Sequence, residues 1–295
     1  MSESHAARPA VAVVILNFNR WHYTVHCLEA LQALDDASFS VVIVDNGSVD
    51  GSSQELARRF PAVPLLEAGR NLGFSGGVNL GLESLRAEPP DYVWLLNNDT
   101  RPLRGSLAAL VAAAEREPRV GAVGSVLVDD DADAAVQARG ARVNFWTGLP
   151  GHHIHPVPRE RIDYLVAASM LVRWQALLDV GFMDERFFLF WEDADLCFRL
   201  RDAGWELAVA EDSVVRHRSG GSLEFRSPTW DREFTASSVL FFRRHATLPW
   251  LPILVSACGR WVKRLSRGEW ASARATWQGL RRGVLDMPRA GEDVG

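Results

Sequence analysis

The first hundred residues alternate short apolar runs with amphipathic stretches, and this order constrains the fold more than any other feature. Apolar runs predict strands, and stretches whose apolar residues recur every three or four positions predict helices. The predicted strands are Val11–Leu16, Val41–Val44, Pro64–Glu67 and Tyr92–Leu96. The predicted helices are Trp21–Leu34, one that opens on the capping box Ser52–Glu55, and one with the stripe Val78, Leu82 and Leu85. This order predicts an α/β fold with a doubly wound parallel sheet and right-handed crossovers.

The pattern continues less regularly along the chain. The later predicted elements are a helix at Ser106–Glu117, a strand at Val120–Val128, an acidic loop at Asp129–Asp133, a strand or buried segment at Tyr164–Val172 and a helix at Arg173–Val180. Between them, Val143–His155 is rich in Gly and Pro and holds three histidines, His152, His153 and His155. We interpret this segment as a flexible, solvated loop, with a metal site as the alternative.

An aromatic run leads directly into three acids near residue 190. Phe187–Trp191 precedes Glu192, Asp193 and Asp195. Acids beside so much aromatic surface are partly desolvated, which raises their pKa values toward the range useful for taking a proton. The alternative is that the acids stand in the first turn of a helix and complement its dipole.

Two further acids, Asp45 and Asp99, each follow a predicted buried strand. Ligands of open α/β sheets bind outside the carboxyl ends of strands, where Asp45 is suited to a base or ribose and Asp99 to a hard divalent cation. A turn that ends the strand explains either acid equally well. The Gly-rich segment Asn71–Asn79 opens a helix, and we expect its amides to face an anion. It is neither a Walker loop nor a dinucleotide fingerprint.

Taken in order, these segments resemble the inverting glycosyltransferases of family 2, which have a GT-A fold, and in particular their rhamnosyltransferase-like branch. The matching segments are VVILNFNR (13–20), VVIVDNGSVDGS (41–52), NLGFSGGVN (71–79), LLNNDT (95–100), GFMDERFFLFWEDADLCFRLRDAGW (181–205) and VVRHRSGGS (214–222). The resemblance implies a GT-A domain over residues 1–225, with its nucleotide-binding half at about 10–105 and its acceptor-binding half at about 106–225. The rest, 226–295, is expected to be a helical, basic and aromatic extension.

The resemblance implies a role for each polar strand end. Asp45 is expected to contact the base or ribose of the donor. The other residues expected to bind the donor nucleotide are Asn17, Asn19, Arg70, Asn71, Gly73, Asn97 and Asn98. Asn97 and Asp99 occupy the places of the family's DxD pair, and the Asn is expected to weaken intrinsic metal affinity. The resemblance implies that Asp99 and His217 bind Mg²⁺ or Mn²⁺, although an ordinary surface histidine explains His217 equally well.

The same resemblance assigns the chemistry. Asp193 matches the family's catalytic base, and Glu192, Asp195 and Asp184 are expected to bind the acceptor. The implied reaction is metal-dependent, inverting transfer of a sugar from a dTDP- or UDP-sugar to a hydroxyl of a glycan or lipid-linked glycan in cell-envelope polysaccharide synthesis. The sugar expected first among the candidates is L-rhamnose. The alternative is a sugar-nucleotide-binding or scaffold protein without turnover. A net charge of −5 argues against a nucleic-acid partner.

The segment Arg243–Arg282 differs in composition from the rest. It holds nine Lys or Arg residues against one acid, Glu269, with four tryptophans interleaved. This composition predicts contact with an anionic membrane surface, with a helical cap packed on the sheet as the alternative. The three cysteines form neither a metal-ligand spacing nor a disulfide framework. We therefore expect a cytoplasmic location, with peripheral attachment to the inner face of the plasma membrane.

Overall fold

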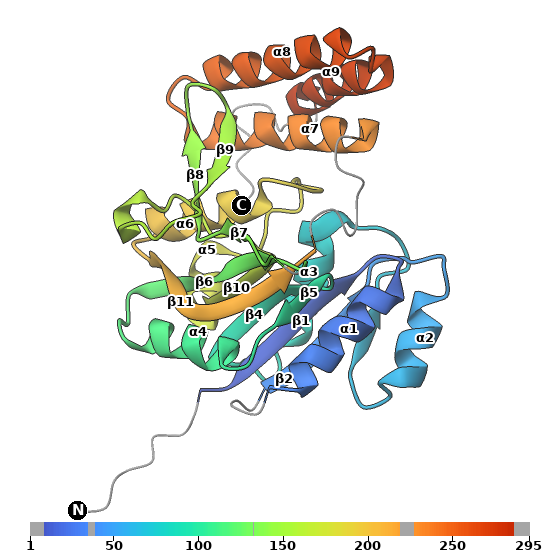
Figure 1. Ribbon diagram of the computed structural model, residues 1–295, viewed down its shortest axis with the longest axis vertical. Helices are drawn as coiled ribbons and strands as arrows, with labels where there is room; N and C mark the ends of the chain where they lie inside the picture. The colour runs from blue at the N-terminus through green and yellow to red at the C-terminus, as the bar shows by residue number, and fades with distance from the viewer. Residues whose placement is uncertain (1–8, 35–38, 132, 219–226, 286–295) are drawn as a thin grey trace, which may run out of the picture.

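A twisted sheet forms the centre of the chain (Figure 1). The computed structural model describes residues 9–34, 39–131, 133–218 and 227–285. The strands, in spatial order, are β3 (Leu65–Glu67), β2 (Phe39–Asp45), β1 (Val11–Asn17), β4 (Tyr92–Asn97), β10 (Ser169–Arg173), β6 (Val120–Asp129), β11 (Glu206–His217) and β5 (Thr100–Pro102), and β7 (Val136–Ala138) pairs with β6. Strands β3, β2, β1 and β4 run parallel, whereas β10 and β5 run antiparallel to their neighbours. The predicted mostly parallel sheet is therefore confirmed.

Apolar cores cover both faces of this sheet. Along β1, Val13 and Ile15 belong to one core and Val14 belongs to the other. Helices α1 (Trp21–Gln32), α2 (Ser52–Arg59) and α4 (Ser106–Glu115) contribute to the first core, and α3 (Gly73–Ser84), α5 (Trp174–Val180) and α6 (Glu192–Asp202) to the second. Burial on both faces explains why β4 is apolar along nearly its whole length instead of alternating.

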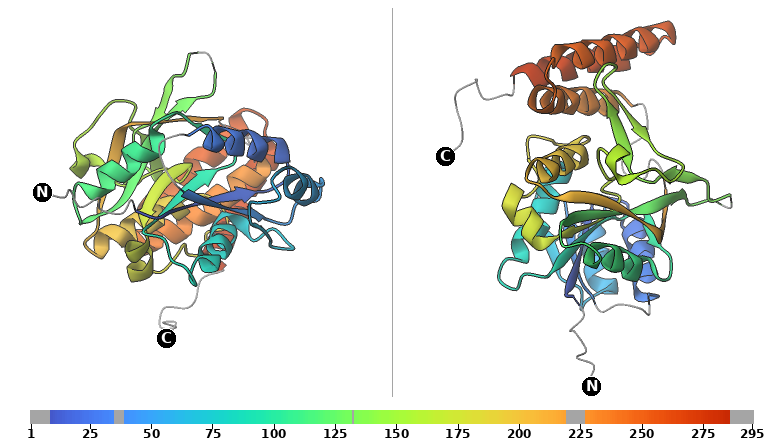
Figure 2. Two further views of the ribbon diagram at one scale, coloured as in Figure 1. Left: turned by 90° about the horizontal axis from the view of Figure 1, so that it is seen from below. Right: turned by 90° about the vertical axis from the view of Figure 1, so that its left-hand side faces the viewer.

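Three long helices lie beyond one end of the sheet (Figure 2). They are α7 (Pro228–His245), α8 (Trp250–Ser266) and α9 (Trp270–Leu285). Helix α7 is part of the main core, because Phe241 and Phe242 are fully buried and pack against Trp191. Burial of each ring stabilises the fold by about 1.5–3 kcal/mol. The predicted boundary near residue 225 lies outside the described residues, so the division into 1–225 and 226–295 stays a prediction.

A β-hairpin reaches from the sheet to these helices. Strands β8 (Ala141–Asn144) and β9 (Leu149–His152) pair antiparallel, so the prediction of a flexible loop is wrong over residues 143–152. The tip packs closely on α8, because a Cβ on Gly148, whose φ is +67°, would lie 2.2 Å from the carbonyl oxygen of Pro252. The three histidines do not form a metal centre, and within the described residues no cluster of three or more His, Cys, Asp or Glu side chains does so.

One further local prediction is wrong. The capping box at Ser52–Glu55 does not form, because Gly51 is the N-cap and the Ser52 hydroxyl donates to Oδ1 of Asp50 at 2.5 Å. The segment Tyr164–Val172, predicted as a strand or buried segment, is buried along nearly its whole length; it follows a short 3₁₀ helix, η1 (Arg159–Arg161), and becomes a strand at Ser169 after an irregular stretch. That irregular stretch lies beside the candidate site described next.

Candidate active site

A buried chain of hydrogen bonds joins the carboxyl ends of β1, β2 and β4. Asn98 Nδ2 donates to the Thr24 hydroxyl (3.0 Å), and that hydroxyl donates to Asn17 Oδ1 (2.6 Å). Asn17 Nδ2 in turn donates to Asp45 Oδ1 (2.8 Å). Asn17 and Thr24 are fully buried and Asn98 is 5% exposed. Asn17 and Asn98 are thus held inside the fold by protein contacts, and Asn17 orients Asp45, which is itself 3% exposed.

Ser48 was missed in the sequence, yet it holds this edge of the sheet together. Its hydroxyl donates to Asp45 Oδ1 (2.6 Å) and accepts from the Asn17 side chain (3.1 Å) and from the backbone N–H of Asn19 (2.7 Å). Asn19 has a left-handed φ of +55°, and its Oδ1 accepts from the Val49 N–H at 3.0 Å. The signal for Ser48 was its place three residues after Asp45 in a turn, where Ser commonly bonds a neighbouring Asp.

The Gly-rich segment is closed by protein contacts. The backbone N–H groups of residues 72, 73 and 74 donate to Asn46 Oδ1 (3.0 Å), Asn71 Oδ1 (2.8 Å) and the carbonyl oxygen of Phe188 (2.7 Å), respectively. The expectation that these amides face an anion is therefore wrong. Gly73 serves close approach instead, because a Cβ there would lie 2.4 Å from that carbonyl oxygen. The loop thus fixes the aromatic run against β2, with Arg70 and Asn71 exposed beside it.

Asp99 and His217 come together from distant parts of the chain. Strand β11 pairs with β5 so that His217 lies opposite Thr100, and the Arg218 N–H donates to the Asp99 carbonyl at 3.0 Å. His217 Nε2 then lies 3.6 Å from Asp99 Oδ1, with the two side chains 18% and 6% exposed. Asn97, at the end of β4, is partly exposed beside them.

Gln137, which the sequence did not indicate, sets the tautomer of His217. Its Nε2 donates to the His217 carbonyl (2.8 Å) and to Asp129 Oδ1 (2.5 Å), so its Oε1 is the acceptor that faces His217 Nδ1 at 2.8 Å. Neutral His217 therefore carries its proton on Nδ1 and turns the Nε2 lone pair toward Asp99. An imidazole nitrogen beside a carboxylate oxygen fits a divalent cation. Mg²⁺ or Mn²⁺ held by two protein ligands keeps places for phosphate oxygens and water.

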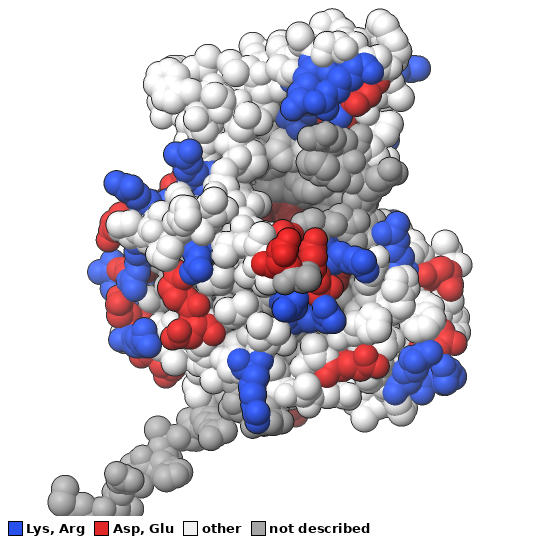
Figure 3. Space-filling model, in the orientation of Figure 1, with Lys and Arg blue, Asp and Glu red and all other residues white. Residues whose placement is uncertain are grey.

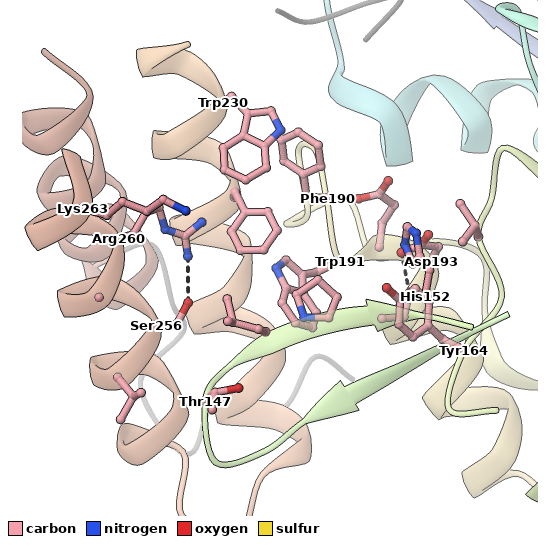
Figure 4. Close-up of a pocket in the computed structure, with 18 of the residues that line it drawn as sticks. Thr147, His152, Tyr164, Phe190, Trp191, Asp193, Trp230, Ser256, Arg260 and Lys263 are labelled. Atoms are coloured by element: carbon pink, nitrogen blue, oxygen red, sulfur yellow. Dashed lines mark hydrogen bonds between the residues drawn. The ribbon is translucent and has the colours of Figure 1, made fainter. Parts of the chain in front are cut away.

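Glu192 and Asp193 line a cavity of about 810 Å³. Its walls come from the β8–β9 hairpin, the segment around Tyr164, the start of α6, and helices α7 and α8 (Figure 4). Phe190 and Trp191, just before α6, both have left-handed φ values, +71° and +68°. Such strain in non-glycine residues persists where the surrounding structure enforces it, and it is concentrated at functional sites. Here it turns the first residues of α6 toward the cavity.

Burial sets the protonation of this acidic pair. Burial raises the pKa of Asp193 to about 6, against hydrogen bonds from the backbone N–H groups of Ala194 and Ala167. Burial, together with the charge of Asp193, raises the pKa of Glu192 well above its usual value. Because the charge of Asp193 is one of the causes that raise the pKa of Glu192, Asp193 is the first carboxylate of the pair to ionise as the pH rises. The expectation that desolvation raises the pKa values of the acids near the aromatic run is confirmed for Glu192 and Asp193, but it is wrong for Asp195, whose pKa is lowered.

One backbone segment connects Asp193 to the end of β4. The Ala167 N–H approaches Asp193 Oδ2 at 3.3 Å, and the carbonyl oxygen of the next residue, Ala168, accepts from the Asn97 N–H at 3.0 Å. Asp193 and the Asn97–Asp99 strand end are thus on either side of a single short segment. The arrangement places a carboxylate able to take a proton beside the edge where Asp45 and Asp99 gather.

Asp195 and Asp184 belong to a different cluster. Asp195 is fully buried, and its carboxylate binds Arg199 (2.8 Å), Arg244 (3.0 Å) and His245 (2.9 Å), with Arg244 also bound to Asp184 (3.0 Å). Burial alone would raise the pKa of Asp195, but the His245 hydrogen bond and the two arginine charges lower it to about 2. Neither Asp195 nor Asp184 lines the cavity; Asp195 joins α6 to α7, and Asp184 joins the segment before α6 to Arg244 of α7.

The chain is similar in sequence to known proteins. The sequence profile described as Glycosyl transferase family 2 matches residues 12–176. The chain is 32% identical over 233 residues to an N-acetylglucosaminyl-diphospho-decaprenol L-rhamnosyltransferase of Mycobacterium tuberculosis, covering 70% of this chain and 76% of the relative. It is 25% identical over 212 residues to the rhamnosyltransferase WbbL of Escherichia coli, covering 67% and 79%.

The fold also has solved counterparts. A mannosyltransferase from Pyrobaculum calidifontis, solved in complex with GDP-Man and Mn²⁺, superposes with a TM-score of 0.61 at 17% identity, covering 95% of this chain and 88% of that one. The GT-A fold expected from the sequence is therefore confirmed, with a curled sheet between helices and three helices at its carboxyl end.

Proposed function

The chain belongs to glycosyl transferase family 2, and from this premise we propose that it is a metal-dependent, inverting glycosyltransferase. The donor is a dTDP- or UDP-sugar, and dTDP-L-rhamnose is the preferred candidate. The acceptor is a hydroxyl of a lipid-linked glycan in cell-envelope polysaccharide synthesis. The observation that carries this proposal is the position of Asp193, on a cavity wall and one short segment away from the end of β4. A base there can serve an acceptor in the cavity and a donor at the sheet edge.

In this mechanism Asp193 takes the proton of the acceptor hydroxyl. The acceptor oxygen attacks the anomeric carbon from the face opposite the leaving nucleoside diphosphate, which inverts the configuration. Glu192, which ionises after Asp193, donates a hydrogen bond to the acceptor while it holds its proton and so fixes the orientation of the acceptor. Asp45, held by Asn17 and Ser48, accepts hydrogen bonds from the base or ribose of the donor. General-base assistance of this kind contributes about 10²–10⁴-fold to the rate.

Asp99 and His217 would hold the divalent cation. The ion supplies positive charge where negative charge develops on the departing diphosphate. The residues of the chain prepare this site, because Gln137 keeps the Nε2 lone pair of His217 turned toward Asp99. Asn97 in place of a first acid leaves a single carboxylate, so we expect metal and donor to bind together.

The relatives support the choice of substrates. Both relatives described above carry the name rhamnosyltransferase, and the mycobacterial one is named for a diphospho-decaprenol acceptor. The cavity suits such an acceptor, because Phe190, Trp191, Trp230 and Phe234 line it and it ends against α8. A glycan attached to an apolar chain satisfies both the polar and the aromatic walls.

Thermal shift measurements test the donor. UDP-, dTDP- and GDP-sugars are each added with Mn²⁺, with Mg²⁺ and with chelator. We expect a metal-dependent rise in melting temperature with dTDP- or UDP-sugars. At a donor concentration a hundred times Kd, binding adds about 2.7 kcal/mol to the free energy of unfolding. The rise should vanish in Asp99→Ala and persist in the control Asp133→Asn, which changes an exposed acid. Binding without sugar transfer would favour the non-catalytic alternative, and no shift with any sugar nucleotide would contradict the proposal.

We further propose that α8 and α9 rest on an anionic membrane surface. Their exposed side chains include Trp250, Leu254, Trp261, Trp270 and Trp277. The charge available is smaller than the composition indicated, because Arg244, Arg264 and Arg282 bind acids of α6, α7 and the α8–α9 turn. The apolar face therefore carries more of the proposal than the charge does. Figure 3 shows this end of the molecule largely free of acidic groups, with one basic patch. Among the described helices, none has the length and hydropathy to cross a bilayer.

Vesicle co-sedimentation tests the membrane proposal. Leu251, Leu254 and Val262, which are 38%, 48% and 58% exposed, are replaced together by Ser. The matched control replaces Leu103, Leu178 and Val49, which are 39%, 41% and 92% exposed and lie outside α8 and α9. We expect the first variant to sediment less with anionic vesicles and the control to sediment as the parent does. Equal sedimentation of all three proteins would remove the membrane proposal.

A further inference from the structure

Arg260 is a cation enclosed by apolar walls. Its guanidinium lies 4.3 Å from the ring centre of Phe234 and 5.8 Å from that of Trp230, and its NH2 group donates to the Ser256 hydroxyl at 2.8 Å. Burial lowers the pKa of Arg260 to about 10, so it stays charged at neutral pH. A charge taken out of water in this way costs free energy unless an anion approaches it.

Within the described residues, the neighbouring arginine, Arg264, has the carboxylate partners that Arg260 lacks. Arg264, one turn along α8, binds Asp231 at 2.9 Å and Glu269 at 2.6 Å. Arg260 has no carboxylate within ion-pair distance in the part of the chain that the structure describes. Asp231 is the acid near Arg260, and it is already bound to Arg264. The chain therefore neutralises one buried arginine of α8 and leaves the other for a group from outside.

Among the described residues that line the cavity, four buried polar atoms lack a hydrogen-bond partner, one of them being Nε of Arg264, whose other nitrogens are paired with Asp231 and Glu269. The other three are Arg260 Nε on α8, Trp191 Nε1 before α6, and Glu192 Oε2 at the start of α6. Figure 4 shows Arg260 and Lys263 on one side of the cavity and Asp193 on the other, with Trp191 and Trp230 between them. Buried polar groups are nearly always hydrogen-bonded, so this cavity is built for a ligand that is polar at both ends.

On the basis of the proposed function, we propose that Arg260, with Lys263 beside it, binds the phosphate that follows the acceptor sugar. The acceptor is then a sugar phosphate ester and not a neutral glycan. Its sugar lies against Glu192 and Asp193. Its phosphate lies against the guanidinium of Arg260, with Lys263 three residues further along on the same face of α8. Because Arg260 and the proposed catalytic base, Asp193, lie at opposite ends of one cavity, the distance between them sets the length of the acceptor head group.

Calorimetric titration with farnesyl diphosphate, farnesol and inorganic pyrophosphate tests this assignment without any transfer reaction. We expect the full chain to bind farnesyl diphosphate at least ten times more tightly than farnesol, as a charge-assisted hydrogen bond implies. If pyrophosphate binds as tightly as farnesyl diphosphate, a free phosphate is sufficient for binding at Arg260. If pyrophosphate binds much more weakly than farnesyl diphosphate, the ligand of this site is a lipid ester. The titrations should be unchanged in Asp99→Ala, which excludes the donor site as their source.

Arg260→Gln should weaken binding of farnesyl diphosphate by about ten- to a hundred-fold and leave farnesol unaffected. The matched control is Arg267→Gln, which removes the same charge from an exposed position at the end of α8, and it should bind within twofold of the parent. If Arg260→Gln lacks a cooperative melting transition, Arg260→Lys replaces it, with an expected loss of three- to ten-fold. Unchanged affinity in the folded Arg260 variant, or farnesol binding as tight as the diphosphate, would overturn the assignment. Arg260-dependent binding without sugar transfer would contradict the proposed function alone.

Discussion

The Nε2 atom of His217 lies 3.6 Å from Oδ1 of Asp99, although one residue ends β11 and the other precedes β5. Two neighbours make this pair chemically specific. The Arg218 N–H donates to the Asp99 backbone, and Gln137 accepts from Nδ1 of His217. A carboxylate oxygen and an imidazole lone pair then face one another, which is a suitable pair of ligands for a divalent cation.

Gln137→Leu tests whether the tautomer matters. Loss of the Nδ1 partner should raise the metal concentration for half-maximal activity by about ten- to a hundred-fold, while kcat at saturating metal stays near the parent value. The measurement is sugar transfer against Mn²⁺ concentration. Gln175→Leu, an exposed glutamine on α5, is the control and should leave the curve unchanged. An unchanged curve for Gln137→Leu would mean that His217 is not a ligand.

Asp193→Asn should lower kcat by about 10²–10⁴-fold, because an amide cannot take the acceptor proton. The donor KM and the melting temperature should stay close to those of the parent, since Asp193 lies on the acceptor side. Steady-state kinetics and a melting curve check both expectations. Asp202→Asn makes the same change at the exposed end of α6 and should retain activity. If both variants were equally active, Asp193 would lose its assignment.

The pH profile follows from the raised pKa of Asp193. A base must be ionised to act, so kcat/KM should be constant above about pH 6 and fall roughly tenfold per pH unit below it. An ordinary exposed Asp would place this limb near its usual pKa of about 4. Initial rates between pH 4.5 and 8, with the folded fraction monitored by circular dichroism, locate the limb. A profile that stays flat down to pH 5 would exclude Asp193 as the base.

Sequence patterns predicted the fold and the sheet edge because both depend on local periodicity. Apolar runs marked β1, β2 and β4, and the acids that follow them gather at one edge, as parallel topology requires. Contacts made by distant segments were not visible. Gln137 binds His217 from another strand, and Asp195 of α6 is bound by Arg244 and His245 of α7, which lie 49 and 50 positions further along the chain.

The roles of Asp193 and Asp195 could not be separated by sequence for the same reason. Two residues apart on a helix, they point to nearly opposite sides. Asp193 lines the cavity, and Asp195 faces Arg244 and His245 of α7. The packing of α7 determines which side of α6 faces the cavity. The composition of residues 226–295 gave no information on how α7 packs. The same packing explains why part of the basic charge of the tail is neutralised.

Acid unfolding tests the structural role of Asp195. Its pKa is lowered to about 2, so the stabilisation it provides is complete above its unfolded pKa of about 4 and is lost as the pH falls through about 2. Two pKa units correspond to about 2–3 kcal/mol of unfolding free energy. Urea unfolding should therefore show Asp195→Asn less stable than the parent at pH 5, with a gap that narrows toward pH 2. A gap independent of pH would contradict this role.

The most direct test of the account is the anomeric configuration of the product. The full chain is incubated with dTDP-L-rhamnose, Mn²⁺ and an N-acetylglucosaminyl diphosphate on a short polyprenyl chain, and the new linkage is determined by NMR. The account predicts repeated turnover, loss of product with chelator, and an anomeric configuration opposite to that of the donor. Retained configuration would contradict direct displacement assisted by Asp193, and donor binding with no product under any of these conditions would contradict the assignment of a transferase activity.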